Sequence, residues 1–463
     1  MVEPVDFQNP PGSEHRPHYD YQALDKNARP AVSIITPFFN TRDVFHETAR
    51  SVLGQSLQQW EWIIVNDGST DEESLKVLNS YRTIDPRIKV IDLPENRGVS
   101  AARNIAIRSA CSDFIFNIDS DDLIEPTAIE KHLWFLLSYP QFSFANSFIV
   151  GFGHQHYLWN SGFHDAERYL SENQSNPNGI FRRSLFFEVG FFEESTRLGL
   201  EDWEFWVKCA NNGLWGGTIP EYLIWYRRRP DHSKKWPNWD KGKNQQIFRE
   251  YLRKTYSKLW IDGMIRVYKH NQSPYDVVSN DIPLENLLEG SRKRVLMVVP
   301  WLELGGADKF NLDLLRELVL HHNFEVSIIT TLPSTHRWFH EFSRYTPDIF
   351  ILDHFLHTSD YPRFIRYLIR SRKIDTVMIA NSDLGYLLLP YLRAYFPDVS
   401  FVDYLHMEEE HWKNGGYPRL SLNNQSQLDL TVVSSCHLKK WMCDRGASSD
   451  HIFVCTTNID PEE

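Results

Sequence analysis

Cysteine is scarce in this chain of 463 residues, and its few copies are scattered. The five cysteines form no C-x-x-C pair, and their odd number does not fit a closed disulfide framework. The sequence therefore predicts neither a disulfide-stabilised fold nor a cysteine-bound zinc site, and a reducing compartment fits it best. The cysteines are Cys111, Cys209, Cys436, Cys443 and Cys455.

The chain also lacks long apolar runs and a positive charge balance. No uninterrupted apolar segment approaches the ~18 residues of a membrane-spanning helix, and the N-terminus, rich in Pro, Glu and His, lacks the apolar stretch of a signal peptide. A formal charge of −12 argues against general nucleic-acid binding, which needs a basic face. We expect a cytoplasmic protein that binds no nucleic acid, and peripheral contact with the inner face of the plasma membrane stays open.

Length and pattern predict an α/β protein of more than one domain. A chain of this size is too long for one ordinary core. After a polar leader at residues 1–30, strands alternate with helices four times, which predicts right-handed crossovers and a mainly parallel sheet in a first domain at 31–268. A polar linker at 269–292 precedes a second Rossmann-like domain at 293–463. Residues 143–180 are less regular, and we expect a loop or an insertion there.

Clustered carboxylates follow an apolar run of strand length, Phe114–Ile118. Asp119, Asp121 and Asp122 lie within four residues, and burying like charges together is costly. A divalent cation would offset that cost, and oxygen ligands suit Mg²⁺ or Mn²⁺, which keep some water and share substrate phosphates. The residues therefore predict a metal–diphosphate site at the carboxyl end of a parallel strand. The alternative is an acidic turn that caps the helix near Pro126.

Two more polar residues are expected near the same edge of the sheet. Asp67 follows the second strand, and its carboxylate suits a base N–H or a ribose hydroxyl, although an Asx turn before Gly68 competes with that interpretation. Arg103 lies in the first turns of the third helix, where it could reach a nucleobase edge or a phosphate, or be a solvated helix charge.

Four motifs follow one another along the first domain. They are Ser33-Ile34-Ile35-Thr36-Pro37, Val65-Asn66-Asp67-Gly68-Ser69, Asn96-Arg97-Gly98 with Ala102-Arg103-Asn104, and Asp119-Ser120-Asp121-Asp122. In this order and spacing they resemble the family-2 glycosyltransferases of the GT-A fold. The resemblance covers roughly residues 30–260 and implies a GT-A nucleotide-diphospho-sugar transferase domain. It also implies a nucleotide-diphosphate sugar donor (a UDP-sugar favoured, a GDP- or dTDP-sugar as alternatives), Mn²⁺ or Mg²⁺ as cofactor, and inversion at the anomeric carbon.

Carried over by position, the resemblance gives the main motif residues distinct roles. Asp67 resembles the base-binding acid, and Arg103 resembles the arginine of the nucleotide pocket. Asp119 looks like the ribose- or metal-linked acid, and Asp121 like the direct metal ligand.

Five further residues receive weaker assignments. Pro37, which we expect to end the first strand, and Ser120 belong to the donor-binding motifs. Phe39 follows the Thr-Pro, where it would either lie over the base or pack in the core. Arg227 and His232 lie in a basic stretch where family members often carry Arg and His, which implies a phosphate contact for Arg227 and a metal contact for His232. The alternative is a solvated basic loop.

An acidic pair followed by a tryptophan opens a predicted helix that runs to about Asn211. A purely structural interpretation of Asp202 is an acid at the N-terminus of a helix, which the helix dipole stabilises by ~0.3–1 kcal/mol. The family carries such a pair here, and its second acid resembles the general base that accepts a proton from the acceptor hydroxyl. The resemblance thus implies Asp202 as the base and Glu201 as a residue that orients it or the acceptor. Trp203 would either pack or shape the acceptor face, on the acceptor side of the site.

The second domain carries three motifs of its own. They are Pro300-Trp301 through Gly305-Gly306-Ala307-Asp308, Asp403-Tyr404-Leu405-His406, and Val432-Val433-Ser434-Ser435. They are similar to the acceptor-side half of family-4 glycosyltransferases with the GT-B fold, over about residues 293–455. Such enzymes bind the sugar nucleotide mainly in a further C-terminal Rossmann domain, which would begin near Asn458. We therefore expect that the donor-binding half is absent, and we assign this half no catalysis of its own.

The leading prediction is an inverting, metal-dependent glycosyltransferase that moves a sugar to a hydroxyl of a glycan or lipid-linked glycan acceptor. The alternative is a catalytically inactive carbohydrate-binding or scaffold protein of a polysaccharide assembly system. A nucleotidyltransferase would need a Gly-rich triphosphate loop and a catalytic Lys near the N-terminus, and neither is found.

Overall fold

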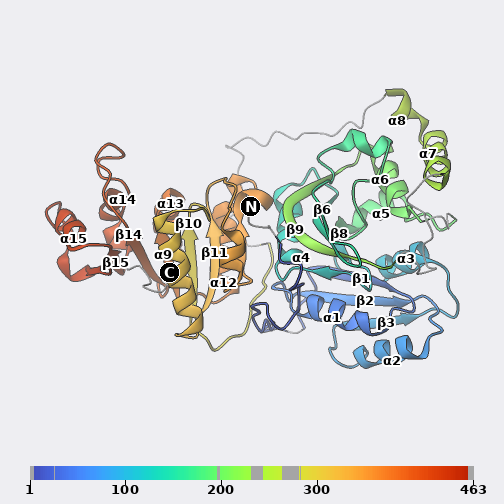
Figure 1. Cartoon of the computed structure of the whole chain (residues 1–463), viewed down its shortest axis with the longest axis horizontal. Helices are drawn as coiled ribbons and strands as arrows, with labels where there is room; N and C mark the ends of the chain where they lie inside the picture. The colour runs from blue at the N-terminus through green and yellow to red at the C-terminus, as the bar shows by residue number, and fades with distance from the viewer. Residues whose placement is uncertain are drawn as a thin grey trace. The chain divides into compact units, whose positions relative to one another are not determined.

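The chain forms two compact α/β units, and the predicted fold class is confirmed (Figure 1). The N-terminal unit holds residues 5–15 and the described residues between 25 and 262. The C-terminal unit holds residues 16–24 and the described residues between 281 and 456. The structure, a computed structural model, describes residues 5–25, 27–195, 199–230, 243–262, 281 and 283–456.

One curled sheet organises the N-terminal unit, with the strand order β3-β2-β1-β4-β8-β6-β9-β5 and β7 paired to β6. Neighbours among β1 to β4 are parallel, whereas β8 is antiparallel to β4 and β6, and β5 is antiparallel to β9. The strands are β1 (Val32–Phe38), β2 (Trp60–Asn66), β3 (Ile88–Asp92), β4 (Phe114–Asn117), β5 (Leu123–Ile124), β6 (Phe144–Gly153), β7 (Tyr157–Trp159), β8 (Gly179–Arg182) and β9 (Gly216–Arg228).

Helices connect the parallel strands, as the alternating pattern predicts. The third helix, α3, packs on β1 and β2, and α1 packs against β5. The α-helices of this unit are α1 (Phe45–Leu53), α2 (Glu72–Tyr81), α3 (Val99–Ser109), α4 (Ala128–Ser138), α5 (Arg183–Val189), α6 (Glu201–Asn211), α7 (Lys243–Thr255) and α8 (Ser257–Asp262).

One local expectation is wrong, and a second is right only in part. Pro37 does not end the first strand, because β1 continues to Phe38. The carbonyl of Ile35 accepts the N–H of Ile118, so the backbone of Ile35 faces β4, and Pro37, two residues on, faces the same side beyond the last β4 partner. The missing N–H of Pro37 therefore costs no ladder bond. The less regular stretch at 143–180 begins with a ten-residue strand, β6, which pairs with β9, whereas residues 160–178 hold no strand.

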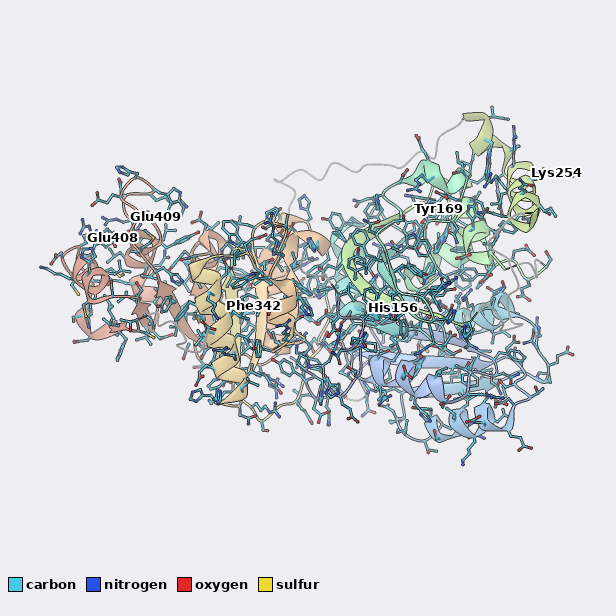
Figure 2. All side chains as sticks on the ribbon, viewed as in Figure 1. His156, Tyr169, Lys254, Phe342, Glu408 and Glu409 are labelled. Atoms are coloured by element: carbon cyan, nitrogen blue, oxygen red, sulfur yellow. The ribbon has the colours of Figure 1, made fainter. Side chains whose placement is uncertain are left out.

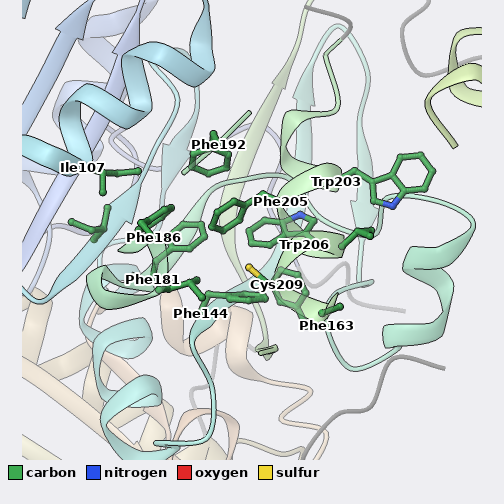
Figure 3. Close-up of a cluster of buried hydrophobic side chains, with 14 of the residues drawn as sticks. Ile107, Phe144, Phe163, Phe181, Phe186, Phe192, Trp203, Phe205, Trp206 and Cys209 are labelled. Atoms are coloured by element: carbon green, nitrogen blue, oxygen red, sulfur yellow. The ribbon is translucent and has the colours of Figure 1, made fainter. Parts of the chain in front are cut away.

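A dense aromatic core lies under α6 and fixes its position (Figure 3). Trp206, on the buried face of that helix, stacks on Phe181 of β8 with ring centroids 5.7 Å apart. Phe205 packs on Phe192 at 4.5 Å. Each such buried side chain contributes about 1.5–3 kcal/mol of transfer free energy. The first turn of α6, which carries Glu201 and Asp202, is therefore held on a rigid base.

The C-terminal unit contains a seven-stranded parallel sheet with the order β12-β11-β10-β13-β14-β15-β16. Phe342 (labelled in Figure 2) packs in the core beneath it. The strands are β10 (Arg294–Val299), β11 (Glu325–Thr330), β12 (Ile349–Ile351), β13 (Thr376–Ala380), β14 (Ser400–Leu405), β15 (Leu430–Val433) and β16 (Ile452–Val454). The α-helices are α9 (Gly306–Leu320), α10 (Phe339–Ser343), α11 (Leu352–Phe355), α12 (Tyr361–Ser371), α13 (Asp383–Tyr395), α14 (Tyr417–Asn423) and α15 (Cys436–Cys443).

Part of the N-terminal leader also belongs to this unit. The hydroxyl of Tyr19 accepts the N–H of Val326 at 2.8 Å and lies 3.0 Å from the hydroxyl of Thr346. Ala23 forms a β-bridge with Leu288. The leader is thus divided between the two units. Among the helices that the structure describes, none is both long and apolar enough to cross a membrane.

Candidate active site

The turn after β4 separates its acidic side chains and gives each one its own partner. Asp119 Oδ1 accepts a hydrogen bond from Arg103 Nη2 at 2.7 Å. Asp121 Oδ2 accepts two bonds from Arg229, at 2.6 Å from Nη2 and 2.9 Å from Nε. These guanidinium groups offset the repulsion between neighbouring carboxylates. The acidic turn is therefore a centre of ion pairing and not a simple helix cap.

Asp122, the last acid of this turn, points inward. It is fully buried, and its carboxylate accepts the Nδ2–H of Asn178 at 2.6 Å and the backbone N–H of Arg227 at 2.8 Å. Burial, with the charges of Asp121 and Asp119, raises its pKa well above the ordinary value. Asp122 thus ties the turn to β9 and is unavailable to a ligand in this arrangement.

Ser120 and Arg227, two predicted donor-binding residues, brace the turn. The Ser120 hydroxyl lies 2.7 Å from the hydroxyl of Thr41. Arg227 Nε donates to the carbonyl of Asp121 at 2.8 Å, and Nη2 donates to Glu47 at 2.7 Å. Both side chains are committed to protein contacts, so their donor contacts stay predictions. His232 lies outside the described residues.

Arg103 joins the turn to the start of α6. It is 1% exposed, and its second terminal nitrogen, Nη1, donates to Glu201 Oε1 at 2.6 Å. Burial alone would lower the pKa of Arg103, but Asp119 and Glu201 raise it above its ordinary value. Arg103 is therefore not a solvated helix charge. Its buried guanidinium brings three separate sequence motifs together.

Asp67 holds the loop that begins α3. Its two carboxylate oxygens accept the backbone N–H groups of Arg97 at 2.7 Å and Gly98 at 2.9 Å, and the residue is 2% exposed. The next residue, Gly68, has φ of +65°, and a Cβ there would lie 2.4 Å from the backbone of Glu95. Each oxygen of Asp67 keeps a second lone pair for a ligand N–H or O–H. The structure thus gives Asp67 a loop-holding role and leaves base binding a prediction.

The two phenylalanines after Pro37 differ in environment. Phe38 is fully buried and packs edge-on against Phe45, with ring centroids 5.1 Å apart. Phe39 is half-buried at the end of β1, as is Pro37 itself. Of the two rings, Phe39 is the one that solvent reaches, which is consistent with the prediction that it lies over a base.

Asp202 lies in the first turn of α6 and is 8% exposed. Asn173 Nδ2 donates to its Oδ2 at 2.8 Å, and the backbone N–H of Trp203 donates to Oδ1 at 2.8 Å. Burial, followed by the nearby charge of Glu201, raises the pKa of Asp202 to about 7. A carboxylate with this pKa is suited to accept a proton near neutral pH.

Trp203 packs in the core, and its role on the acceptor side stays a prediction. The side chain is fully buried, and its indole N–H donates to the carbonyl of Tyr169 at 2.7 Å. Its ring packs on Phe248 with centroids 5.8 Å apart (Figure 3 shows Trp203 at one end of the core). Because Trp203 follows Asp202 directly, its burial fixes the orientation of the helix turn that carries the acid.

Three residues of the site belong to no motif that could have identified them from the sequence. Asn173 and Asn178 lie in the irregular stretch before and at the entry to β8, and Arg229 follows the end of β9. Asparagine is common in turns, so its presence in such a segment carries little information. Arg229 lies in a basic stretch in which the sequence analysis gives a site role only to Arg227 and His232. The roles of Asn173, Asn178 and Arg229 depend on contacts between segments that are far apart in the sequence.

The oxygen donors at this site fit a hard divalent cation. The side chains of Asp119 and Asp121 are 24% and 23% exposed, so both reach solvent. Mg²⁺ or Mn²⁺ uses one or two carboxylates and keeps waters or phosphates as its other ligands, so these two side chains would be enough to hold such an ion. The cation would compete with Arg229 for Asp121.

A comparison with protein families finds a match over this site. Residues 33–203 match the family model described as Glycosyl transferase family 2. This segment contains the turn after β4, Asp67, Arg103 and the acidic pair at Glu201 and Asp202. Over these residues the N-terminal unit is therefore similar to glycosyltransferase family 2.

Individual proteins are similar to parts of the chain. The putative teichuronic acid biosynthesis glycosyltransferase TuaG of Bacillus subtilis (strain 168) is 44% identical over 111 residues, which are 24% of this chain and 44% of TuaG. The uncharacterized glycosyltransferase MJ1057 of Methanocaldococcus jannaschii is 25% identical over 247 residues, which are 50% of this chain and 80% of that protein. The crystal structure of S. aureus TarS 1-349 in complex with UDP-GlcNAc is 19% identical, with a TM-score of 0.39, and the match covers 49% of this chain and 65% of that chain. The chain spans less than half the length of TuaG.

Proposed function

We propose that the N-terminal unit is an inverting glycosyltransferase that moves a sugar from a nucleoside-diphosphate donor to a hydroxyl of a glycan or lipid-linked glycan. The observation that carries this proposal is the buried Arg103, which links Asp119 to Glu201 at 2.7 and 2.6 Å. Glu201 precedes Asp202, whose pKa is raised to about 7. A donor-side acid and a base that titrates near neutrality are thus held in one network.

The reaction that suits this arrangement is a single in-line displacement. The acceptor hydroxyl oxygen attacks the anomeric carbon as the bond from that carbon to the diphosphate oxygen breaks on the opposite face, which inverts the configuration. Asp202, ionised, accepts the hydroxyl proton, a contribution of roughly 10²–10⁴-fold in rate. Asn173 keeps the carboxylate oriented through its 2.8 Å hydrogen bond.

Divalent-metal use is part of the proposal. Asp121, with Asp119, would hold Mg²⁺ or Mn²⁺, and the ion would neutralise charge on the departing diphosphate. Asp67 and Phe39 would contact the base, with a UDP-sugar favoured over a GDP- or dTDP-sugar. The relative TuaG bears a name from teichuronic acid biosynthesis, which supports a cell-envelope glycan as the acceptor class.

For the C-terminal unit, we infer a half of a GT-B-like glycosyltransferase without catalysis of its own. Its parallel sheet places Gly305 and Gly306 at the N-terminus of α9, directly after β10. That arrangement supports ligand approach at the carboxyl edge of the sheet. No reaction is assigned to it.

The test is release of nucleoside diphosphate from a panel of sugar nucleotides with Mn²⁺, for the full chain and for Asp202→Asn. Asp202→Asn keeps the shape of the side chain but removes the base, so we expect a loss of roughly 10²–10⁴-fold in kcat. Donor binding, followed by calorimetry, should be retained. Equal rates in both proteins would overturn the proposal and favour the inactive carbohydrate-binding or scaffold alternative.

A further inference from the structure

Three potential metal ligands meet in the C-terminal unit, at the carboxyl ends of neighbouring strands. His336 lies in the loop after β11, and Asp353 and His354 lie in α11, directly after β12. Open α/β sheets bind ligands at this edge. The spacing of these residues in the sequence matches no common metal motif, so only the fold brings them together.

The three side chains are close enough to share one ion. One ligand atom from each lies within 4.8 Å of the others. The imidazole rings of His336 and His354 are 5.7 Å apart between centroids and nearly perpendicular, at 84°. Bonds of about 2.0–2.2 Å to a tetrahedral zinc hold neighbouring ligands roughly 3.4 Å apart. Side-chain movements of roughly an ångström would therefore complete the site.

Burial and polarity also favour a bound cation. Oδ1 of Asp353 is buried and accepts no hydrogen bond from the described residues. An unsatisfied buried acceptor costs about 1–3 kcal/mol, more when it is charged, and a cation would remove that cost. His336 is 4% exposed, whereas Asp353 and His354 are half-buried. The site is therefore closed on the His336 side and reachable by solvent on the other.

The backbone holds His336 in place. Its φ is +48°, in the left-handed region that costs energy for a residue other than glycine. The N–H of Leu302 donates to its Nδ1 at 3.3 Å, a long hydrogen bond. The ring would bind an ion through Nδ1 in place of this contact, or through Nε2 after its proton moves to Nδ1.

We propose that His336, Asp353 and His354 form a site for a transition-metal ion of the Zn²⁺ class, with three protein ligands and an open position toward solvent. Two imidazoles and one carboxylate suit Zn²⁺, Co²⁺ or Fe²⁺, whereas Mg²⁺ prefers oxygen ligands alone. The site differs in unit, ligand type and metal class from the acidic site of the N-terminal unit. It does not depend on the glycosyltransferase proposal.

The experiment is a titration of the metal-free full chain with Co²⁺, because nitrogen-ligated Co²⁺ gives a visible absorption band. We expect one equivalent to produce the band, Zn²⁺ to abolish it by competition, and excess Mg²⁺ to leave it. Asp353→Asn and His354→Ala, both at half-buried positions, should weaken binding by more than the roughly 10–100-fold that loss of an outer-shell partner costs.

Matched controls separate this site from other ligands in the chain. His322→Ala removes an exposed histidine of the same unit that lies outside the cluster, and Asp121→Ala removes the acid of the other site. Both should bind Co²⁺ as the unaltered chain does. Circular dichroism melting without metal verifies that each variant is folded. No stoichiometric band, or a band unchanged in both Asp353→Asn and His354→Ala, would overturn the proposal.

Discussion

Asn173 offers a direct test of the general base, because its side chain touches Asp202 and belongs to no recognised motif. Its Nδ2–H donates to Asp202 Oδ2 at 2.8 Å, and this hydrogen bond lowers the pKa of Asp202 against the larger effects of burial and of Glu201. Asn173→Ala removes the donor and leaves the acid in place. The pKa of Asp202 should therefore rise further above its value of about 7.

The size of the effect follows from the hydrogen bond. A bond to a charged group contributes about 1.5–3 kcal/mol, which corresponds to roughly one to two pH units. Asp202 must be ionised to accept a proton, so activity rises as pH rises through its pKa. The acidic limb of the kcat/KM profile should move up by that amount in Asn173→Ala. At pH 7 the ionised fraction, and with it the rate, should fall roughly 5- to 50-fold.

The measurement is nucleoside-diphosphate release against pH for the unaltered chain, Asn173→Ala and a matched control. Asn212→Ala serves as the control, since the Asn212 side chain donates to the Lys208 carbonyl at the end of α6 opposite to Asp202. The control should keep the original profile. A limb that stays in place in Asn173→Ala would refute the reasoning, because the titrating base would then not be the acid that Asn173 touches.

Three further predictions concern ion pairs. Arg103→Gln leaves Asp119 and Glu201 without their shared cation, so the free energy of unfolding of the N-terminal unit in urea should fall by about 3–5 kcal/mol, and an unchanged midpoint would contradict a structural role for the pair. Arg229→Ala releases Asp121 from a partly exposed pair worth about 0.2–1 kcal/mol, so Mn²⁺ should bind roughly up to fivefold tighter by calorimetry; weaker binding would mean that Arg229 assists the ion. Asp348→Ala breaks an ion pair with Arg372 in which the side chains are 1–2% exposed and 2.8 Å apart. The free energy of unfolding of the C-terminal unit should therefore fall by about 3–5 kcal/mol. An unchanged unfolding transition would show that the pair does not stabilise the unit.

Sequence periodicity predicts those helices and strands whose buried residues recur at a regular spacing. The sequence predicts helices at 71–82, at 100–110 and from 202 to about 211. The observed helices at 72–81, 99–109 and 201–211 agree with these spans to within one residue, because each has a buried face at helical spacing. The strand at 144–153 was missed because it is buried on both sides, so it shows no alternation of polar and apolar residues. Its identity depends on pairing with β9, which lies far along the chain.

For the site, the sequence predicts which motif residues lie together, but it does not predict the hydrogen-bond partner of each residue. The acidic turn, Arg103 and Asp202 could be predicted, since they follow strand ends and match a family pattern. Their partners Asn173 and Arg229 could not, because a hydrogen bond between segments far apart leaves no periodic or spaced signal. The inward turn of Asp122 is likewise a tertiary effect, decided by Asn178.

The charge of the assembled site argues for a cation in donor binding. Six carboxylates and three guanidinium groups make up this network, so its formal charge with every carboxylate ionised is −3, from three positive and six negative groups. A diphosphate adds further negative charge, and like charges in a partly buried site repel strongly. We therefore expect sugar-nucleotide binding, followed by calorimetry, to require Mg²⁺ or Mn²⁺ and to be lost with EDTA. Equal affinity with and without the chelator would show that the arginines alone neutralise the diphosphate. The groups counted are Glu47, Asp119, Asp121, Asp122, Glu201 and Asp202, with Arg103, Arg227 and Arg229.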